Sequence, residues 1–267
     1  MARAAREQRF VFGEVAELYD RARAGYPAEL VDDVLRFTGI DVERLRALEV
    51  GAGTGKATVA FAARGIEILA LEPHPEMAAV AVRNCRPFPR ARIAPQTFEE
   101  WPLETDAFGL VFAAQSFHWV DPAVRWVKAA QALQTGGTLA LMGHQVRWRG
   151  EELRDELEDV YQHLAPDLLA HNPGFPGLRE RDDAGLGDEI TASGWFGAVT
   201  PRTYVWSAQL SADSFLNLLA TQSDHRLLAG TTRARLFDGL RRVIAAHGGE
   251  VTVPNITTLT LARRRLG

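Results

Sequence analysis

Short apolar runs alternate with amphipathic stretches over the first half of the chain. The apolar runs predict buried strands at 47–50, 66–71, 92–94, 110–114 and 138–142. The amphipathic stretches between them predict helices at 56–64, 75–85 and 122–133. Such an alternation indicates an α/β fold with a parallel, doubly wound sheet, in which ligands bind at the carboxyl ends of the strands.

Turn residues support these helix boundaries. Gly65 would adopt the left-handed conformation that ends a helix. Pro75 suits the first turn of the next helix, and Asp121 is a cap in front of Pro122. Gly136-Gly137 then ends that helix before the fifth strand. An earlier pair of helices is expected within 10–37.

The regular alternation stops after Gly143. A helix at 151–164 has one apolar face, and a Pro/Gly-rich loop follows, so we expect 144–185 to be a helical cap insertion over the substrate. Residues 1–143 would form the N-terminal helices and the cofactor-binding core, and 186–267 would complete the same α/β domain. The elements expected in that last part are strands at 198–206 and 251–261, the second kinked or partly unpaired at Pro254, and helices at 212–229 and 232–247.

The segment Gly51-Ala52-Gly53-Thr54-Gly55 lies between the first strand and a helix that begins at Lys56. Glycines allow the backbone to turn sharply and a ligand to lie directly against it. Glu72 ends the second strand, where its carboxylate can accept hydrogen bonds from both hydroxyls of a ribose. These features predict an adenosine-containing cofactor at the mouth of the sheet.

Three kinds of cofactor are considered for this glycine spacing. A phosphate-binding P-loop would need a glycine at Val50 and a serine or threonine at Ala57. A dinucleotide fingerprint would need a sixth-position glycine where Lys56 stands. The acid at Glu49 suits S-adenosylmethionine, because that ligand carries a sulfonium and an ammonium and has no phosphate.

Composition narrows the class of protein. The chain has 267 residues, of which 46% are hydrophobic, and this suits a globular protein with a sizeable core. A net charge of -4 argues against general nucleic-acid binding. The single cysteine, Cys85, excludes an internal disulfide, and no apolar run is long enough to span a bilayer, so we expect a cytoplasmic protein without a membrane partner. The histidines are scattered, and no metal site is expected.

Four motifs together resemble those of class I S-adenosylmethionine-dependent methyltransferases, within their group of small-molecule enzymes. They are the glycine segment at 48–56, an N-terminal segment at 12–27, Gln115-Ser116-Phe117-His118-Trp119-Val120-Asp121, and the ending at 254–264. The resemblance spans nearly the whole chain. It implies a Rossmann-like, seven-stranded sheet with an antiparallel last strand, and S-adenosyl-L-methionine as the cofactor.

The same resemblance implies a set of cofactor-binding residues. Gly51, Gly53 and Gly55 would lie under the methionine and ribose, Glu49 near the amino end, and Glu72 on the ribose hydroxyls. The remaining candidates are an apolar wall near the adenine (Pro73 and Met77), a pair standing where the family often has Asp-Ala (Thr97 and Phe98), and Gln115 of the fourth-strand motif. Tyr19 and Arg23 are candidates for closing over the cofactor carboxylate or the acceptor, and their alternative is an ordinary solvated helix face.

Methyl transfer is a direct displacement, so the protein mainly aligns the reactants and excludes water. A general base is needed only when the acceptor must lose a proton. His118 is the candidate catalytic base, because it follows the fourth strand. Its alternative role is to position the loop or the cofactor. The residues in or beside the insertion that are candidates for lining an acceptor pocket are His144, Trp148, Tyr161, His163 and His171. The alternative for each of them is a structural or exposed position.

The leading interpretation is therefore a methyltransferase acting on a small molecule, with a carboxylate or another oxygen nucleophile among the acceptors considered. One alternative is a protein that binds S-adenosylmethionine without catalysis. A nicotinamide-dependent oxidoreductase is a third hypothesis, and it predicts binding of NAD instead.

Overall fold

The computed structural model describes residues 15–146, 152–170 and 184–265. The chain forms two compact units. The α/β unit consists of 24–144, 182–204 and 257–267, and the helical unit consists of 1–23, 145–181 and 205–256. Both units are therefore built from segments that lie far apart in the sequence.

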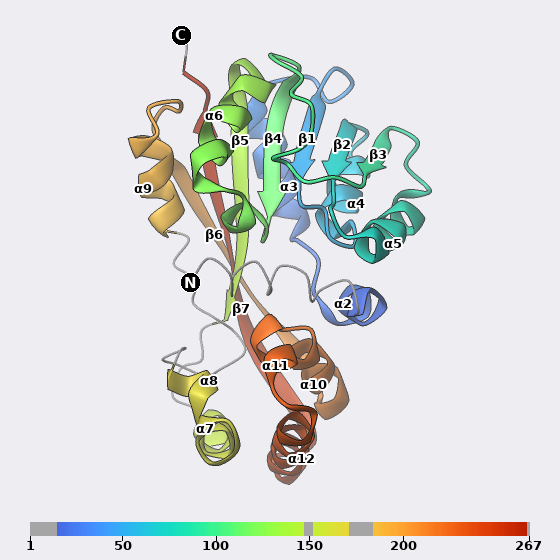
Figure 1. Cartoon of the computed structure of the whole chain (residues 1–267), viewed down its shortest axis with the longest axis vertical. Helices are drawn as coiled ribbons and strands as arrows, with labels where there is room; N and C mark the ends of the chain where they lie inside the picture. Colours follow the sequence, from blue (N-terminus) through green and yellow to red (C-terminus); the bar gives the residue numbers. More distant parts are fainter. Residues whose placement is uncertain (1–14, 147–151, 171–183, 266–267) are drawn as a thin grey trace. The chain divides into compact units, whose positions relative to one another are not determined.

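A seven-stranded sheet has the order β3-β2-β1-β4-β5-β7-β6 (Figure 1). Its strands are β1 (Arg46–Val50), β2 (Glu67–Leu71), β3 (Ala91–Ala94), β4 (Phe108–Ala114), β5 (Leu133–Val146), β6 (Thr200–Ser211) and β7 (Glu250–Arg263). The first five strands are parallel, with β1 paired to both β2 and β4, and the last strand is antiparallel. The Rossmann-like fold expected from the sequence is thereby confirmed.

Alternate residues of the parallel strands pack against different helices. Leu48 and Val50 of β1 share a core with α6 (Pro122–Ala132) and with Ile190 of α9 (Ala184–Ala192). Ala47 instead shares a core with α3 (Ala28–Thr38) and α4 (Lys56–Ala62). Near the sheet edge, α5 (Pro75–Cys85) packs against α4 and β3. Both faces are covered, and the strand ends remain as the place for a ligand.

The helical unit has its own apolar core. Its helices are α2 (Ala16–Ala22), α7 (Glu152–Leu164), α8 (Pro166–Ala170), α10 (Ala212–Ala220), α11 (Ser223–Leu227) and α12 (Gly230–Ala246). Leu157 of α7 is fully buried in one cluster with Leu219 of α10 and Leu240 of α12. This grouping differs from the expected division, which placed all of 186–267 in the α/β domain. Residues 205–256 pack with α7 and α8 because their apolar faces match.

The fifth strand begins earlier than its sequence suggests. Helix α6 ends at Ala132, and Leu133 already pairs with Phe108, so β5 is longer than the expected 138–142. Gly136 does not end the helix but lies within β5 at a φ of +75°. The pairing register shifts there, before Thr138 pairs with Leu110. The strand starts early because Leu133 is fully buried in the sheet core.

Two other boundaries also differ from expectation. The single helix expected at 212–229 is divided into α10 and α11, and between them the Thr221 hydroxyl donates to the Leu218 carbonyl at 2.7 Å. Strand β7 continues through Pro254, although the alternation of buried and exposed residues is interrupted at 254–256. The Pro/Gly-rich loop at 172–177 lies outside the described residues.

Candidate functional site

The glycine loop after β1 has a left-handed backbone at each of its three glycines. At Gly51 a Cβ would lie only 2.5 Å from the Cβ of Ser116, so the loop packs directly against the turn after β4. The Ser116 hydroxyl also donates to the Val50 carbonyl. At Gly53, in contrast, a Cβ would meet nothing within 4 Å. The loop is thus held on one side and leaves open space above its middle glycine.

Glu72 links the end of β2 to this loop. The carboxylate is buried, and its Oε2 accepts from the Gly53 N–H at 2.7 Å. Its Oε1 accepts from the His74 N–H at 3.0 Å. A carboxylate has about four acceptor positions, so it can also accept from the vicinal hydroxyls of a ribose. The position of Glu72 beside the open side of Gly53 therefore fits the adenosine part of the expected cofactor.

Glu49 lies beneath the loop with no exposed surface. Its Oε2 accepts from the Thr58 hydroxyl at 2.5 Å, while its Oε1 has no hydrogen-bond partner among the described residues. Burial raises the pKa of Glu49 to about 8, an effect that the Thr58 hydrogen bond opposes and the nearby charge of Glu72 reinforces. A cationic group of a ligand would favour the ionised form, so this buried acid fits an ammonium group.

The turn after β4 is strained at Gln115, whose φ is +61°. A positive φ is uncommon for a residue other than glycine, and such strain is retained where surrounding contacts hold it. Here the Gln115 N–H donates to the Met142 carbonyl at 2.9 Å, and Nε2 donates to the His144 carbonyl at 3.0 Å. The His144 ring contacts the Thr257 hydroxyl at 2.9 Å and stacks on Tyr26, with ring centroids 4.6 Å apart.

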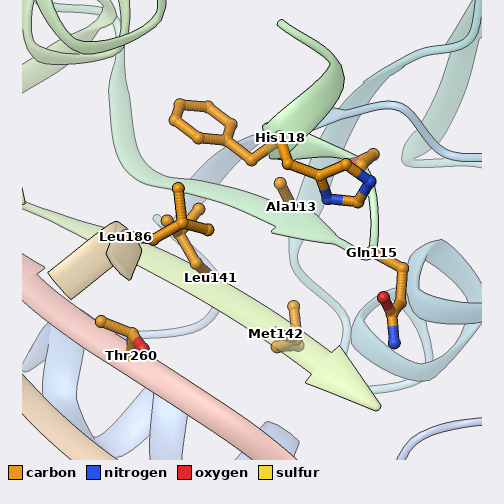
Figure 2. A pocket seen from close by; sticks show the side chains of 9 residues that line it. Ala113, Gln115, His118, Leu141, Met142, Leu186 and Thr260 are labelled. Atoms are coloured by element: carbon orange, nitrogen blue, oxygen red, sulfur yellow. The ribbon is translucent and has the colours of Figure 1, made fainter. Parts of the chain in front are cut away.

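His118 lies on the 3-10 turn Phe117–Trp119, which follows the strained Gln115 and Ser116. Its ring is half-buried and its centroid is 4.9 Å from that of Trp119. Figure 2 shows it beside a hollow that Gln115 and Met142 also line. The structure thus brings His118 and Gln115 together at the carboxyl end of β4, where the sequence motif predicts them.

The candidates for an adenine contact lie near the ends of β2 and β3. Met77 is buried on α5, and Pro73 is half-buried next to Glu72. The Thr97 hydroxyl donates to Glu100 at 2.9 Å and accepts from the Glu100 N–H at 3.1 Å, so it caps its own turn. Phe98 is buried and packs against other aromatic rings of the sheet core. The contacts of these residues with a cofactor stay predictions.

Tyr19 and Arg23 belong to the helical unit. Arg23 donates to the Thr221 hydroxyl at 2.8 Å and to the Thr221 carbonyl at 3.3 Å, which ties the end of α2 to the end of α10. Its guanidinium lies 5.1 Å from the centroid of the Tyr19 ring. The proposed role of this pair on the cofactor carboxylate also stays a prediction.

Two candidates for the acceptor pocket lie on α7. Tyr161 is fully buried in the helical core, where its hydroxyl contacts Nε2 of His225 at 2.7 Å, because its side of α7 is the apolar face. His163 contacts the Asp159 carbonyl of its own helix at 2.7 Å. Trp148 and His171 lie outside the described residues.

Sequence reasoning missed several residues that the structure brings to the site. Thr58 was not expected to be the partner of Glu49. Leu186 of α9 and Thr260 of β7 line the hollow beside His118, although they come from distant segments. Thr58 follows the glycine segment by two residues, Thr260 lies within the ending at 254–264, and Leu186 belongs to no motif, but only the tertiary structure shows which residues they contact.

Metal sites and membrane-spanning helices are two further features to consider in the described residues. No group of three or more histidine, cysteine, aspartate or glutamate side chains there is arranged to hold a metal ion. In the same residues, no helix combines the length and the apolar character that crossing a membrane requires.

Known methyltransferases are similar to this chain in sequence and in fold. Residues 48–141 match the model of a methyltransferase domain. The chain is 30% identical over 242 residues to an uncharacterized methyltransferase from Mycobacterium tuberculosis, covering 91% of this chain and 88% of that protein. The solved structure of a putative type II methyltransferase from Anaeromyxobacter dehalogenans is similar in fold, with a TM-score of 0.59 and 21% identity. The match covers 91% of this chain and 97% of the other.

A second similar fold is that of a phosphoethanolamine N-methyltransferase from Haemonchus contortus, with a TM-score of 0.52 and 14% identity. The match covers 95% of this chain and 58% of that one, which was solved with phosphomonomethylethanolamine and S-adenosylhomocysteine. At this identity the likeness concerns the fold alone.

Proposed function

Because the chain belongs to the class I S-adenosylmethionine-dependent methyltransferases, we propose that it transfers a methyl group from S-adenosyl-L-methionine to a small-molecule acceptor. The observation that carries this proposal is the arrangement at Gly53. Its left-handed backbone leaves open space on one side, and its N–H is bonded to the buried carboxylate of Glu72. A ribose can lie against such a glycine and reach that carboxylate.

The glycine loop and the residues around it would each bind a different part of the cofactor. Glu72 would accept hydrogen bonds from the ribose hydroxyls, and Glu49 would provide negative charge for the amino end. Gly51 allows Ser116 to approach, which brings the turn after β4 next to the loop. The reacting part of the cofactor would then face Gln115 and His118.

When bound, S-adenosylmethionine supplies a methyl group activated by the sulfonium. The protein's contribution is to align the acceptor with that methyl group and to exclude water. His118 would take a proton from an acceptor that must lose one. A small molecule with a carboxylate or another oxygen nucleophile is the acceptor that we propose. The single cysteine, which is free and buried, suits a reducing compartment, and we place the enzyme in the cytoplasm.

Calorimetry with S-adenosylhomocysteine and with NAD tests the cofactor. We expect S-adenosylhomocysteine to bind and NAD not to bind. Transfer of a labelled methyl group to a metabolite extract, and not to its protein or nucleic acid fraction, would support a small-molecule acceptor. Binding without transfer to any fraction would favour a non-catalytic protein, and binding of NAD alone would favour an oxidoreductase.

A variant of Glu72 tests where the cofactor binds. We expect Glu72→Ala to weaken S-adenosylhomocysteine binding more than tenfold, because each hydrogen bond to a charged acceptor is worth about 1.5–3 kcal/mol. Glu67→Ala is the matched control, since Glu67 lies at the exposed amino end of the same strand. Equal affinity of the two variants would remove Glu72 from the site.

A further inference from the structure

Lys128 on α6 donates to the backbone of the turn at 97–101, which follows β3. Its Nζ lies 2.8 Å from the Glu99 carbonyl oxygen and 2.6 Å from the Trp101 carbonyl oxygen. The same Nζ lies 5.6 Å from the ring centroids of both Phe98 and Trp101, which is within the range of a cation–π contact. A single ammonium group therefore contacts most of this turn.

A second hydrogen bond joins the turn at 97–101 to the beginning of α6. The Asp121 N–H donates to Oε1 of Glu99 at 3.1 Å. Asp121 is the N-cap of α6 and stands three positions after His118. The Phe98 ring also packs against Phe117, with centroids 6.4 Å apart. The turn after β3 is thus joined to the turn that carries His118.

The same turn borders a groove on the sheet. The groove is lined by Gln96, Trp101 and Pro102 together with residues of β1, β2 and β3, and none of the described residues that line it belongs to a helix. A turn beside such a groove is not held there by packing against a helix. Its position over the sheet therefore depends largely on its contacts with α6.

The beginning of the turn carries a backbone donor that no described residue uses. The Thr97 carbonyl accepts from the Trp101 N–H at 3.0 Å, and the Thr97 hydroxyl accepts from the Glu100 N–H at 3.1 Å. The Phe98 N–H, in contrast, donates to no described residue. Adenine has ring nitrogens that accept hydrogen bonds. A turn that is already fixed would present this N–H to the base without the entropy loss of ordering it on binding.

We propose that Lys128 is a positioning residue for the cofactor, whose ammonium group holds the turn at 97–101 in the conformation that binds adenine. This inference rests on the proposed function, because adenine is part of S-adenosyl-L-methionine. The ammonium group acts through the two carbonyls of the turn and not through contact with the cofactor. Without it, the free energy needed to order the turn would be taken from cofactor binding.

Lys128→Met tests this role, because it removes the ammonium group and keeps an unbranched side chain. We expect the variant to bind S-adenosylhomocysteine at least tenfold more weakly than the wild type. Calorimetry should be done at a temperature where circular dichroism shows every protein to be folded. Gln131→Met is the matched control, since it makes a similar change at another half-buried position of α6, and it should bind as the wild type does.

Restoring the ammonium group separates its role from that of the rest of the side chain. Treatment of Lys128→Cys with 2-bromoethylamine adds an aminoethyl group to the new thiol and rebuilds the ammonium group at nearly the original distance. Burial raises the pKa of the Cys85 thiol to about 11, so Cys85 should stay unmodified, as mass spectrometry can check. We expect the treated protein to regain an affinity within threefold of the wild type, and the untreated variant to bind as weakly as Lys128→Met.

Hydrogen exchange reports on the turn itself. In the protein without ligand, we expect exchange at 97–101 to be faster in Lys128→Met than in Gln131→Met. In the wild type, S-adenosylhomocysteine should slow exchange at the same residues, because the base would cover the Phe98 N–H.

The outcomes distinguish the two proposals. Failure of the wild type to bind S-adenosylhomocysteine would reject the proposed function and this inference with it. Three results would reject the role of Lys128 alone: Lys128→Met binds the ligand as well as Gln131→Met does, the aminoethyl group restores no affinity, or the bound ligand leaves exchange at 97–101 unchanged.

Discussion

Gly53 shows how a single residue prepares a site. Its φ of +59° is a left-handed conformation that a side chain rarely adopts, and the space where a Cβ would stand is open. A Cβ there would meet no protein atom within 4 Å, so a side chain would occupy the space left for a ligand. Glycine is therefore needed at this position for its backbone conformation and for the space that a ligand would occupy, and not for packing against other protein atoms.

We expect Gly53→Val to fold and to lose at least a hundredfold in affinity for S-adenosylhomocysteine, because the branched side chain would stand where the ligand lies. The matched control is Gly194→Val, since Gly194 has a φ of +76° and equally open surroundings away from the loop. Both variants carry a similar backbone strain, so their melting temperatures should fall together. Calorimetry that finds the same affinity in both would place the cofactor elsewhere.

Glu49 is a residue whose burial gives stability a pH dependence. Its folded pKa of about 8 lies above the unfolded value of 4.5, so the stability gained by burying the neutral acid is complete below pH 4.5 and is lost as the pH rises toward 8. One pKa unit corresponds to about 1.4 kcal/mol, so the loss amounts to several kcal/mol.

Glu49→Gln keeps a neutral group of the same shape and removes this titration. We expect the variant to be more stable than the wild type at pH 8 and similar to it at pH 4.5, as measured by chemical denaturation at both pH values. Wild-type and variant curves that run parallel between these pH values would show that Glu49 ionises normally.

At the scale of elements, a buried carboxylate joins α3 to the edge strand β6. The Tyr204 hydroxyl donates to Asp33 at 2.6 Å, and Arg36 donates to the same carboxylate at 2.6 Å. These bonds lower the pKa of Asp33 below its usual value of 3.8, the Tyr204 bond having the largest effect. The link is thus complete above pH 3.8 and weakens as the pH falls through the lowered pKa.

We expect Tyr204→Phe to lower the free energy of unfolding at pH 7 by about 1.5–3 kcal/mol, the usual worth of a hydrogen bond to a charged group. The difference from the wild type should shrink as the pH falls below 3.8 and through the lowered pKa of Asp33. Thr203→Ala, an exposed neighbour on the same strand, serves as the control. A difference that stays constant with pH would mean that only ring packing was lost.

At the scale of the whole molecule, the two units have separate cores, and the helical core contains a polar chain. The Asp224 carboxylate accepts from Nδ1 of His225 at 2.9 Å, and Nε2 of the same ring lies 2.7 Å from the Tyr161 hydroxyl. Both Tyr161 and His225 are fully buried. Burial raises the pKa of Tyr161 well above its usual value, so its hydroxyl stays protonated and acts as the donor.

Tyr161→Phe leaves His225 without this partner, and we expect a loss of about 1–3 kcal/mol from an unsatisfied buried group. Hydrogen exchange should accelerate in α7, α10, α11 and α12, which share that core. In Tyr204→Phe it should accelerate instead around α3 and β6. Identical exchange patterns in the two variants would show that the units do not open separately.

The sequence by itself determined the features that depend on short spacings. The alternation of strands and helices through β5, the glycine loop and Glu72 can all be read from residues a few positions apart. A seven-stranded sheet with an antiparallel last strand was also predicted, although from the family resemblance and not from periodicity, and the structure added the order of the strands. His118 and Gln115 were found because they belong to the motif after β4.

Only the tertiary structure decided what depends on residues far apart in the chain. It pairs Gln115 with His144 and His144 with Thr257, brings Leu186 and Thr260 to the hollow, and groups 205–256 with α7 and α8. It also buries Glu49 completely, which shifts its pKa. No local pattern encodes these contacts, because they arise only when separate segments pack together and exclude water from the groups between them.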